Sequence, residues 1–419
     1  MTHSKMRGLW LTRSLPFPLD TGDRIYSARL LRSVADSGAE LSVVGFAPQP
    51  ADAVPADWPV CWLTVPGAPH GTARALASTL PLVAAAHATA AYRAQVRALA
   101  REDWDFVVFD QYGMGWAMAP FLRRRHGRGR GAGPVLVHVA HDHEASVYAS
   151  LVRGYRGFPL KRAALWQNWL KTRSLERHIA RSVDLVTAIT REDAVRFVAD
   201  APNAASVVLT PGYGGAVSQR GRIDAGVPRQ VVMVGNYRWV AKSENLRQFV
   251  AAADAAFHAS GITLHVIGAM SDGLADELRR GTRATVLHGF VADIAPHFAN
   301  ARIAVVPEEI GGGFKLKFLD YIFGRVAVAS LTHATAGLPE AIRSAMICRD
   351  DVGSLVQAIV AHIDDTDALS LMQDAALAAA RARYRWEDRG QELLDAVRRH
   401  AALHRQPGRP LRIDAEATS

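Results

Sequence analysis

Four side chains that can move protons or hold a metal follow one predicted strand. The segment AHDHEAS places His141, Asp142, His143 and Glu144 at the end of the apolar run Val135–Ala140. Histidine and aspartate can take the proton of a hydroxyl near neutral pH. We therefore expect a general base or a group that orients a sugar, with His141 and Asp142 as candidates. A structural turn is one alternative. A metal site is the weaker one, because no further cluster has ligand spacing.

A glycine-rich turn with two lysines is the second candidate site. Gly311–Gly313 follow the apolar strand Ala301–Pro307, and Lys315 and Lys317 open a short helix that ends at Gly324. Glycine lets the backbone approach a ligand closely, and a helix N-terminus offers unpaired N–H groups to an anion. Lysines in a first helical turn oppose the helix dipole, and a negative ligand would remove that conflict. The stretch predicts an anion site, unless it is a turn with solvated lysines.

A third candidate is the loop SLPFPLDTGDR, Ser14–Arg24, between the first strand and the first helix. Gly22 lies just before that helix, and Asp23 is one of the residues that could cap it. The loop has no G-x-G-x-x-G pattern, which argues against a nicotinamide or flavin enzyme. A capped loop without any chemical role is an equal alternative.

Two more segments follow predicted strands in the second half of the chain. VGNYRWVAKSENL contains cationic and glycine positions that could meet a diphosphate, namely Gly235, Arg238 and Lys242. LHGFV, Leu287–Val291, ends in a glycine turn that could press its backbone against a flat base.

The elements that must position these residues alternate regularly between strand and helix. The expected strands of the first half are Gly8–Thr12, Leu41–Phe46, Phe106–Asp110, Val135–Ala140, Leu185–Ile189 and Ser206–Leu209. Its expected helices are Arg24–Gly38, Ala73–Ala100, Gly115–Arg125, Leu160–Arg181 and Arg191–Ala199. This alternation is typical of a parallel sheet with helices on both faces.

The same pattern restarts after a segment rich in glycine and proline. The second set of strands is Gln230–Val234, Thr263–Gly268, Thr285–His288, Ile303–Val306 and Val326–Ser330. Its helices are Ser243–Ala259, Leu274–Arg280, Ile294–Ala299 and Leu316–Phe323, and a final helix covers Trp386–Ala402. We predict two doubly wound α/β domains, with ligands bound in a cleft at the carboxyl ends of their strands. The expected boundaries are a first domain at 1–212, a linker at 213–228, a second domain at 229–385, a closing helix at 386–404 and a disordered tail at 405–419.

Composition and charge limit the possible classes of protein. The chain has 419 residues, of which 49% are hydrophobic and 21% charged, and its two cysteines make no disulfide framework. Neither a signal peptide nor a run of about twenty apolar residues is present, so we expect a soluble protein or one resting on a membrane. Thirteen lysines and arginines lie between Arg123 and Arg181, against Asp142, Glu144 and Glu176. Such a surface attracts anionic lipid or nucleic acid.

Taken together, these segments resemble the GT-B glycosyltransferases, in particular the family-4 (group 1) retaining enzymes that use nucleotide sugars. The resemblance is carried by PFPLDTGDRIYSARLL, LERHIARSVDLVTAITREDAVRF, VVMVGNYRWVAKSENLRQFV, IGGGFKLKFLDYIFGRVAVAS and YRWEDRGQELLDAV, which span nearly the whole chain. It implies two Rossmann-like domains facing across a cleft, with a C-terminal helix that crosses back to the first domain.

The resemblance also implies roles for particular residues. Donor binding would fall to Gly22, Gly235, Arg238, Lys242, His288, Gly289, Phe290, Val291, Glu309, Gly312, Gly313, Phe314, Lys315, Leu316 and Asp320. Catalytic roles would fall to His141, Asp142 and Asp23, with His141 beside the transferred sugar. The family commonly has two glutamates eight positions apart. Here these positions are Gly312 and Asp320, and Glu308 or Glu309 could replace the first.

The implied activity is transfer of a hexose-type sugar from a UDP- or GDP-sugar to a hydroxyl, with retention and without a metal or other cofactor. The expected partners are the nucleotide sugar and a glycan or lipid-linked acceptor. We expect a cytoplasmic location, either free or at an anionic inner membrane face, and a part in bacterial polysaccharide or glycoconjugate biosynthesis. A basic helix with Trp166 and Trp169, within Lys161–Ser182, favours the membrane unless these rings pack on the sheet. The alternatives are a nucleotide-sugar 2-epimerase, a non-catalytic nucleotide-sugar binder and, without any recognised module, a nucleic-acid binder.

Overall fold

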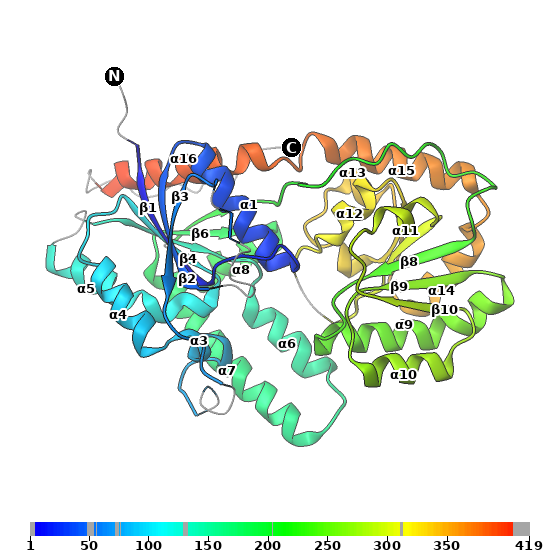
Figure 1. Ribbon diagram of the computed structural model, residues 1–419, viewed down its shortest axis with the longest axis horizontal. Helices are drawn as coiled ribbons and strands as arrows, with labels where there is room; N and C mark the ends of the chain where they lie inside the picture. The colour runs from blue at the N-terminus through cyan, green and yellow to red at the C-terminus, as the bar shows by residue number, and fades with distance from the viewer. Residues whose placement is uncertain are drawn as a thin grey trace. The chain divides into compact units, whose positions relative to one another are not determined.

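The computed structural model describes residues 5–47, 54–55, 57–71, 75, 77–128, 133–202, 204–310 and 313–404. The chain forms two compact units (Figure 1). The first unit comprises the residues up to Pro211 together with those from Trp386 onward, and the second comprises Gly212–Arg385. The predicted tail, 405–419, lies outside the described residues.

The first unit is built on a seven-stranded parallel sheet in the order β3-β2-β1-β4-β5-β6-β7. Its strands are β1 (Arg7–Ser14), β2 (Glu40–Phe46), β3 (Val60–Val65), β4 (Phe106–Asp110), β5 (Val135–Val139), β6 (Leu185–Ala188) and β7 (Ala205–Val208). Its helices are α1 (Gly22–Asp36), α3 (Leu82–His87), α4 (Ala90–Leu99), the 3₁₀ helix η2 (Tyr112–Ala117), α5 (Ala119–Arg128), α6 (Glu144–Gly154), α7 (Pro159–Ser182), α8 (Arg191–Asp200) and α16 (Trp386–His404). Helices α1 and α16 cover one face, and α3, α4 and α7 lie on the other (Figure 1).

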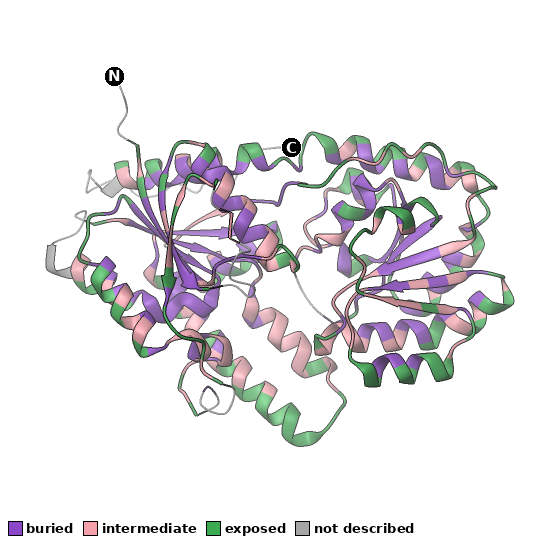
Figure 2. Cartoon of the chain, viewed as in Figure 1, coloured by how far each residue is buried: buried purple, intermediate pink, exposed green. Residues whose placement is uncertain are grey.

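The second unit contains a six-stranded parallel sheet in the order β10-β9-β8-β11-β12-β13. Its strands are β8 (Gln230–Val234), β9 (Thr263–Ile267), β10 (Thr285–Gly289), β11 (Ile303–Val306), β12 (Ala327–Leu331) and β13 (Ile347–Arg349). Its helices are α9 (Val240–Ala259), α10 (Asp272–Gly281), α11 (Ala295–Ala299), α12 (Lys317–Phe323), the 3₁₀ helix η3 (Thr332–Thr335), α13 (Glu340–Arg343), α14 (Val352–His362) and α15 (Thr366–Arg381). The central strands are buried on both faces, as Figure 2 shows, because helices cover the sheet from both sides.

The prediction of two parallel, doubly wound sheets is confirmed. Both strand orders reverse at a central point, between β1 and β4 in the first sheet and between β8 and β11 in the second. Side chains at the carboxyl ends of these four strands are therefore the ones that such a sheet presents to a ligand.

Some elements differ from the prediction. The single helix expected over 73–100 is interrupted, because Pro81 begins α3 and Thr89 caps α4 by accepting a hydrogen bond from the Tyr92 N–H. Strands β3 and β13 and helices α6, α13, α14 and α15 were not predicted. Helix α6 lies in the stretch where the sequence indicated only the polar cluster at 141–144.

Helix α16 packs directly on α1 within the first unit. The Ser33 hydroxyl donates to the Trp386 carbonyl and accepts from the Gly390 N–H. A side chain at position 390 would collide with the Ser33 backbone, so glycine permits this close approach.

The segment after Pro211, which the sequence indicates as a linker, packs against the second unit. The Tyr213 ring stacks on Phe323 with the ring centroids 4.2 Å apart, and Ile223 is buried in the core of that unit. Among the described residues, none of the helices combines the length and the apolar character needed to span a bilayer.

Candidate functional site

A buried carboxylate with lysines around it lies just beyond β11 in the second unit. Glu308 is buried, and its Oε1 accepts hydrogen bonds from Lys317 Nζ at 2.7 Å and from Lys242 Nζ at 3.3 Å. Lys242 comes from the first turn of α9, which follows β8, and Lys317 begins α12. The cluster therefore lies at the point where the strand order of the second sheet reverses.

This cluster is strongly polarised. Burial raises the pKa of the Glu308 carboxyl, but the three neighbouring ammonium groups, those of Lys242, Lys317 and Lys315, lower it by more, so that it stays ionised. Burial lowers the pKa of Lys317 to about 8, against the attraction of Glu308. Three ammonium groups thus lie around the Glu308 carboxylate, and lysines gathered in this way can also stabilise an anionic ligand.

The backbone beside these lysines is held in an unusual conformation. Gly313 has a φ of +67°, which favours glycine, and its carbonyl accepts a hydrogen bond of 2.9 Å from Lys315 Nζ. Just before the turn, the buried side chain of Asn245 pairs with both backbone groups of Ile310, at 2.8 and 2.9 Å. Gly311 and Gly312, two of the predicted glycines, lie outside the described residues.

Other predicted donor residues also belong to the second unit. Phe314 is half-buried against Tyr384, and Leu316 is the residue before α12. Gly235 is the residue after β8, and its backbone packs against Gly268. Any side chain at position 268 would collide with the Gly235 carbonyl. Arg238 is exposed, as is Glu309. The structure thus places Glu308, and not Glu309, among the lysines.

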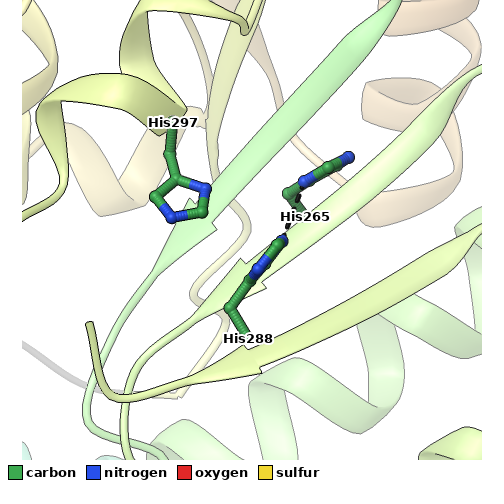
Figure 3. Close-up of side chains that lie close together, drawn as sticks. All are labelled: His265, His288 and His297. Carbon is green, nitrogen blue, oxygen red and sulfur yellow. Dashed lines mark hydrogen bonds between the residues drawn. The ribbon is translucent and has the colours of Figure 1, made fainter.

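The predicted base-contacting segment lies at the end of the edge strand β10. His288 Nε2 is 2.9 Å from His265 Nδ1 on the neighbouring strand β9, and His297 of α11 lies beside them (Figure 3). Gly289 follows with a φ of +69°, and the next ring, Phe290, is 77% exposed while Val291 is half-buried. An exposed aromatic ring after a glycine turn is a suitable surface for a planar base.

Asp320 lies on α12 with its side chain exposed. The surrounding atoms raise the pKa of its carboxyl to about 6, mainly by desolvation, while Lys317 opposes the shift. Because the side chain is exposed, solvent screens part of this effect. The same carboxylate helps to raise the pKa of the Tyr213 hydroxyl to about 12, after burial of that ring.

A pH dependence follows if Asp320 accepts hydrogen bonds from ribose hydroxyls. The affinity for a sugar nucleotide should then rise as the pH increases from about 5 to 7, because only the ionised carboxylate accepts both bonds. A sugar nucleotide is preferable to a nucleoside diphosphate because its phosphates have no proton that titrates in this range. Calorimetric titrations with wild type and Asp320→Asn test this, since the variant should bind more weakly at pH 7 and lose most of the slope. An unchanged slope in the variant would remove Asp320 from the site.

In the first unit, His141 lies in a closed set of hydrogen bonds at the end of β5. Its Nε2 is 2.9 Å from Asp110 Oδ1 and 3.3 Å from Ser27 Oγ, and its Nδ1 is 3.1 Å from the Gln111 amide nitrogen. The carboxylate of Asp110 fixes the proton on Nε2, so that Nδ1 is the acceptor for the Gln111 amide. The Tyr26 ring packs edge-on against the imidazole at 5.0 Å.

Gln111 connects this histidine to the strand-order reversal of the first sheet. It follows β4 with φ +68° and ψ 158°, a conformation that is strained for any residue but glycine. Asp110, the last residue of β4, also accepts a hydrogen bond of 2.9 Å from the buried Trp10 indole of β1. Strain of this kind persists where the surrounding structure requires one side-chain direction, and here that direction is toward His141.

The predicted loop before α1 brings a second charged pair to the same end of the sheet. Asp23 Oδ2 accepts a hydrogen bond of 2.7 Å from Arg13, at the end of β1, and Thr21 donates to its other oxygen. Burial raises the pKa of Asp23. The attraction of Arg13 and the hydrogen bond from Thr21 together lower it by more, so the net shift of the pKa is downward. Gly22 is the exposed first residue of α1.

The other half of the polar cluster has a structural role. His143 bonds to Ser146 at 2.7 Å and to Asp200 at 3.3 Å, and burial lowers its pKa. Glu176 of α7 accepts the backbone N–H groups of Glu144 and Ala145, and so caps the N-terminus of α6. Burial, and then the nearness of Glu176, raise the pKa of the Glu144 carboxyl. Asp142, which stands between the two histidines in the sequence, is half-buried.

The structure thus brings the predicted residues into two groups, one in each unit. Sequence reasoning missed Asp110, Gln111 and Arg13, did not include Lys317 among the donor-binding residues, and left open the choice between Glu308 and Glu309. The signal that could have found the first three is their place at the ends of the first and third predicted strands. Lys317 and Glu308 stood in a segment already singled out.

Comparisons with known proteins agree with the fold. Residues 228–365 match the family described as glycosyl transferases group 1. HepE (Alr3699) of Anabaena, solved in complex with UDP and glucose, superposes with a TM-score of 0.62 at 15% identity, covering 94% of this chain and 100% of that one. WaaG, a glycosyltransferase involved in lipopolysaccharide biosynthesis, gives 0.62 at 16% identity, over 93% and 99%.

A trehalose-6-phosphate synthase from Burkholderia multivorans gives a TM-score of 0.62 at 14% identity and covers 98% of this chain and 100% of that one. Among curated proteins, none matches. The chain therefore has the fold of the GT-B glycosyltransferases. Within that fold, the match to the group 1 glycosyl transferases covers residues 228–365 of the second unit.

Proposed function

We propose that the protein transfers a hexose-type sugar from a UDP- or GDP-sugar to a hydroxyl acceptor, with retention of anomeric configuration. The observation that carries the proposal is the cluster of Lys242, Lys315 and Lys317 around buried Glu308, at the strand-order reversal of a group 1 glycosyl transferase domain. That HepE was solved with UDP and with UDP-glucose supports a uridine donor.

The chemistry of the reaction explains why such a cluster is needed. Cleavage of the bond between sugar and diphosphate leaves negative charge on the departing phosphate oxygens. Fixed cations stabilise that charge without reorganising during the reaction. The ammonium groups supply this charge from the chain itself, so we expect donor binding to need no divalent ion. In the retaining reaction the acceptor hydroxyl attacks the face from which the diphosphate leaves, and the diphosphate oxygen can accept its proton.

His141, whose ring nitrogens both have protein partners, fits a positioning role better than that of a general base. To accept a proton, Nδ1 would have to lose its bond from Gln111. We therefore assign His141, held by Asp110, to positioning the strand ends that lie beside the transferred sugar, and Asp23 with Arg13 to the same end of the first sheet. Asp142 stays a candidate for a catalytic role.

Replacing Lys317 by Met tests the phosphate assignment. We expect the affinity for UDP to fall by about 10- to 100-fold, the value of one charge-assisted hydrogen bond. The affinity for uridine, which has no phosphate, should stay the same. Isothermal titration with both ligands measures the two effects separately. The matched control is Arg279→Met on α10, where the exposed guanidinium pairs with Asp276. Equal losses for uridine and UDP, or none for either, would contradict the assignment.

The proposed acceptor is a glycan or lipid-linked sugar, as in bacterial polysaccharide assembly, and the supporting feature is the hairpin of α6 and α7. Its tip is exposed (Figure 2), including the apolar side chains of Phe158, Leu160 and Trp166. The same two helices and their connection carry exposed basic residues, namely Arg153, Arg156, Lys161, Arg162 and Arg173. Trp169, in contrast, packs inward and donates to the Ala145 carbonyl. Exposed rings among cations are typical of helices that lie on anionic membranes.

Charge reversal at this tip should release the protein from membranes. We expect Lys161→Glu/Arg162→Glu to weaken binding to vesicles of phosphatidylglycerol and phosphatidylcholine by about 30-fold or more, at about 1 kcal/mol per basic residue. Co-sedimentation measures this, and the matched control is Arg279→Glu/Arg280→Glu on α10. Equal loss in both double variants would indicate only a general charge effect, and no binding by wild type would exclude the membrane.

Two alternatives share the donor site. An epimerase would convert the nucleotide sugar with no acceptor present, and a non-catalytic binder would hold UDP without turnover. The paired residues of the first unit, His141 with Asp110 and Asp23 with Arg13, favour transfer over simple binding. Incubation of UDP-glucose with and without acceptor, followed by analysis of the sugar released or converted, separates the three.

A further inference from the structure

Three histidines from separate elements meet at the edge of the second sheet. His265 lies in β9, His288 in the edge strand β10 and His297 in the short helix α11, and Figure 3 shows the three rings gathered together. Each ring offers one nitrogen, and these three nitrogens lie within 4.8 Å of one another. All three side chains are half-buried, so an ion from solvent can reach them.

The spacing is close to that of a three-histidine metal centre. With Zn–N bonds of about 2.0–2.1 Å, two ligands at tetrahedral angles are about 3.3 Å apart. His265 Nδ1 and His288 Nε2 are 2.9 Å apart, so they need to separate by only a few tenths of an ångström. His297 has to move inward, and it stands on a five-residue helix, which can shift more easily than a strand.

The arrangement of the rings also needs an explanation. The imidazoles of His265 and His288 stack at 5.0 Å, and that of His288 meets His297 edge-on at 4.5 Å. Two imidazole nitrogens at 2.9 Å can share only one hydrogen, so one ring must donate to the other unless an ion lies between them. The position of the site is distinct from the lysine cluster, whose residues come from α9, α12 and the end of β11.

We propose that His265, His288 and His297 bind one divalent ion of the Zn²⁺, Co²⁺ or Ni²⁺ type, with water completing the coordination. Neutral imidazole is the preferred ligand of these borderline ions, whereas Mg²⁺ and Ca²⁺ prefer oxygen. The ion joins an edge strand to its neighbour and to α11, so its role is to stabilise this edge of the second unit. The proposal needs no ion at the phosphates of the donor, although His288 also belongs to the segment predicted to face the nucleobase.

Metal titration of the untagged, chelator-treated and desalted full chain tests the proposal. We expect calorimetry to show one Zn²⁺ per chain and the melting temperature to rise, with no effect of Mg²⁺. Co²⁺ should give the intense visible absorption of a tetrahedral nitrogen site. His297→Gln should weaken Zn²⁺ binding by more than about 100-fold, beyond the loss seen when only an outer-shell partner of a metal ligand is removed.

Two further measurements keep the test decisive. The melting temperature of metal-free His297→Gln should equal that of metal-free wild type, which shows that the variant folds. The matched control is His258→Gln, an exposed histidine of α9, which should bind Zn²⁺ like wild type. Absence of Zn²⁺ binding by wild type, or equal binding by His297→Gln, overturns the proposal and leaves the cluster as a set of stacked, hydrogen-bonded rings.

Discussion

Replacing Glu308 by Gln is expected to lower the stability of the second unit and, at the same time, to increase its response to UDP. The carboxylate is the anion that Lys242 and Lys317 contact, and all three lysines contribute to its lowered pKa. Removing one partner of a buried ion pair costs about 3 kcal/mol or more, since the remaining charges lose their counter-ion. For a unit of this size that corresponds to a melting temperature lower by about 6–12 °C.

The response to UDP distinguishes a ligand site from a purely structural cluster. The diphosphate would supply the negative charge that the variant lacks, so the UDP-induced rise in melting temperature should be larger in Glu308→Gln than in wild type. Differential scanning calorimetry with and without UDP measures both quantities on one sample. Uridine should give no such difference, because it carries no phosphate.

The neighbouring residue offers a matched control. Glu309 is exposed, and Glu309→Gln should change neither the melting temperature nor the response to UDP. If Glu308→Gln is destabilised but UDP gives no larger rise than in wild type, the lysines hold Glu308 for structural reasons alone. The phosphate assignment would then fail.

The sequence was sufficient to predict the fold, because both sheets are parallel and their strands are short apolar runs between amphipathic helices. Runs such as Phe106–Asp110 and Ile303–Val306 are buried along their whole length, so apolar character alone indicates them. Strand β3 (VCWLTV) is also an apolar run, but it is a short edge strand between Pro59 and Pro66 whose residues are mostly only partly buried, and it was missed. The exact residues at which strands end were the hardest to predict, and both groups of site residues lie at such ends.

The site residues could be predicted only where they lie close together in the sequence. The glycine turn and Lys315 stand in one segment, so spacing alone indicated an anion site there. Asp110 and His141, in contrast, are thirty-one positions apart and meet only because β4 and β5 are neighbours in the sheet. The three histidines of β9, β10 and α11 come together for the same reason, and no ligand spacing in the sequence could reveal them.

The second large effect is expected at His141. Replacing it by Ala should reduce sugar transfer by about 100-fold or more, the cost of a misplaced reacting group, while leaving the affinity for UDP unchanged. The reason is that His141 belongs to the first unit, whereas the lysine cluster that we assign to the diphosphate belongs to the second. Steady-state rates with a saturating donor, together with calorimetric titration of UDP, measure the two properties independently.

Two further variants test whether the loss is specific to His141: Asp110→Asn removes its partner, and His143→Gln is the control. Asp110→Asn keeps the shape of the residue but removes the charge beside His141 Nε2, so it should reproduce part of the loss and alter the pH profile of transfer. His143→Gln removes a histidine only two positions away that contacts Ser146 and Asp200. It should lower stability without changing the rate per folded molecule. Full activity of His141→Ala, or an equal loss in His143→Gln, would show that this strand end supports the fold and not the reaction, and the first unit would then need a different catalytic centre.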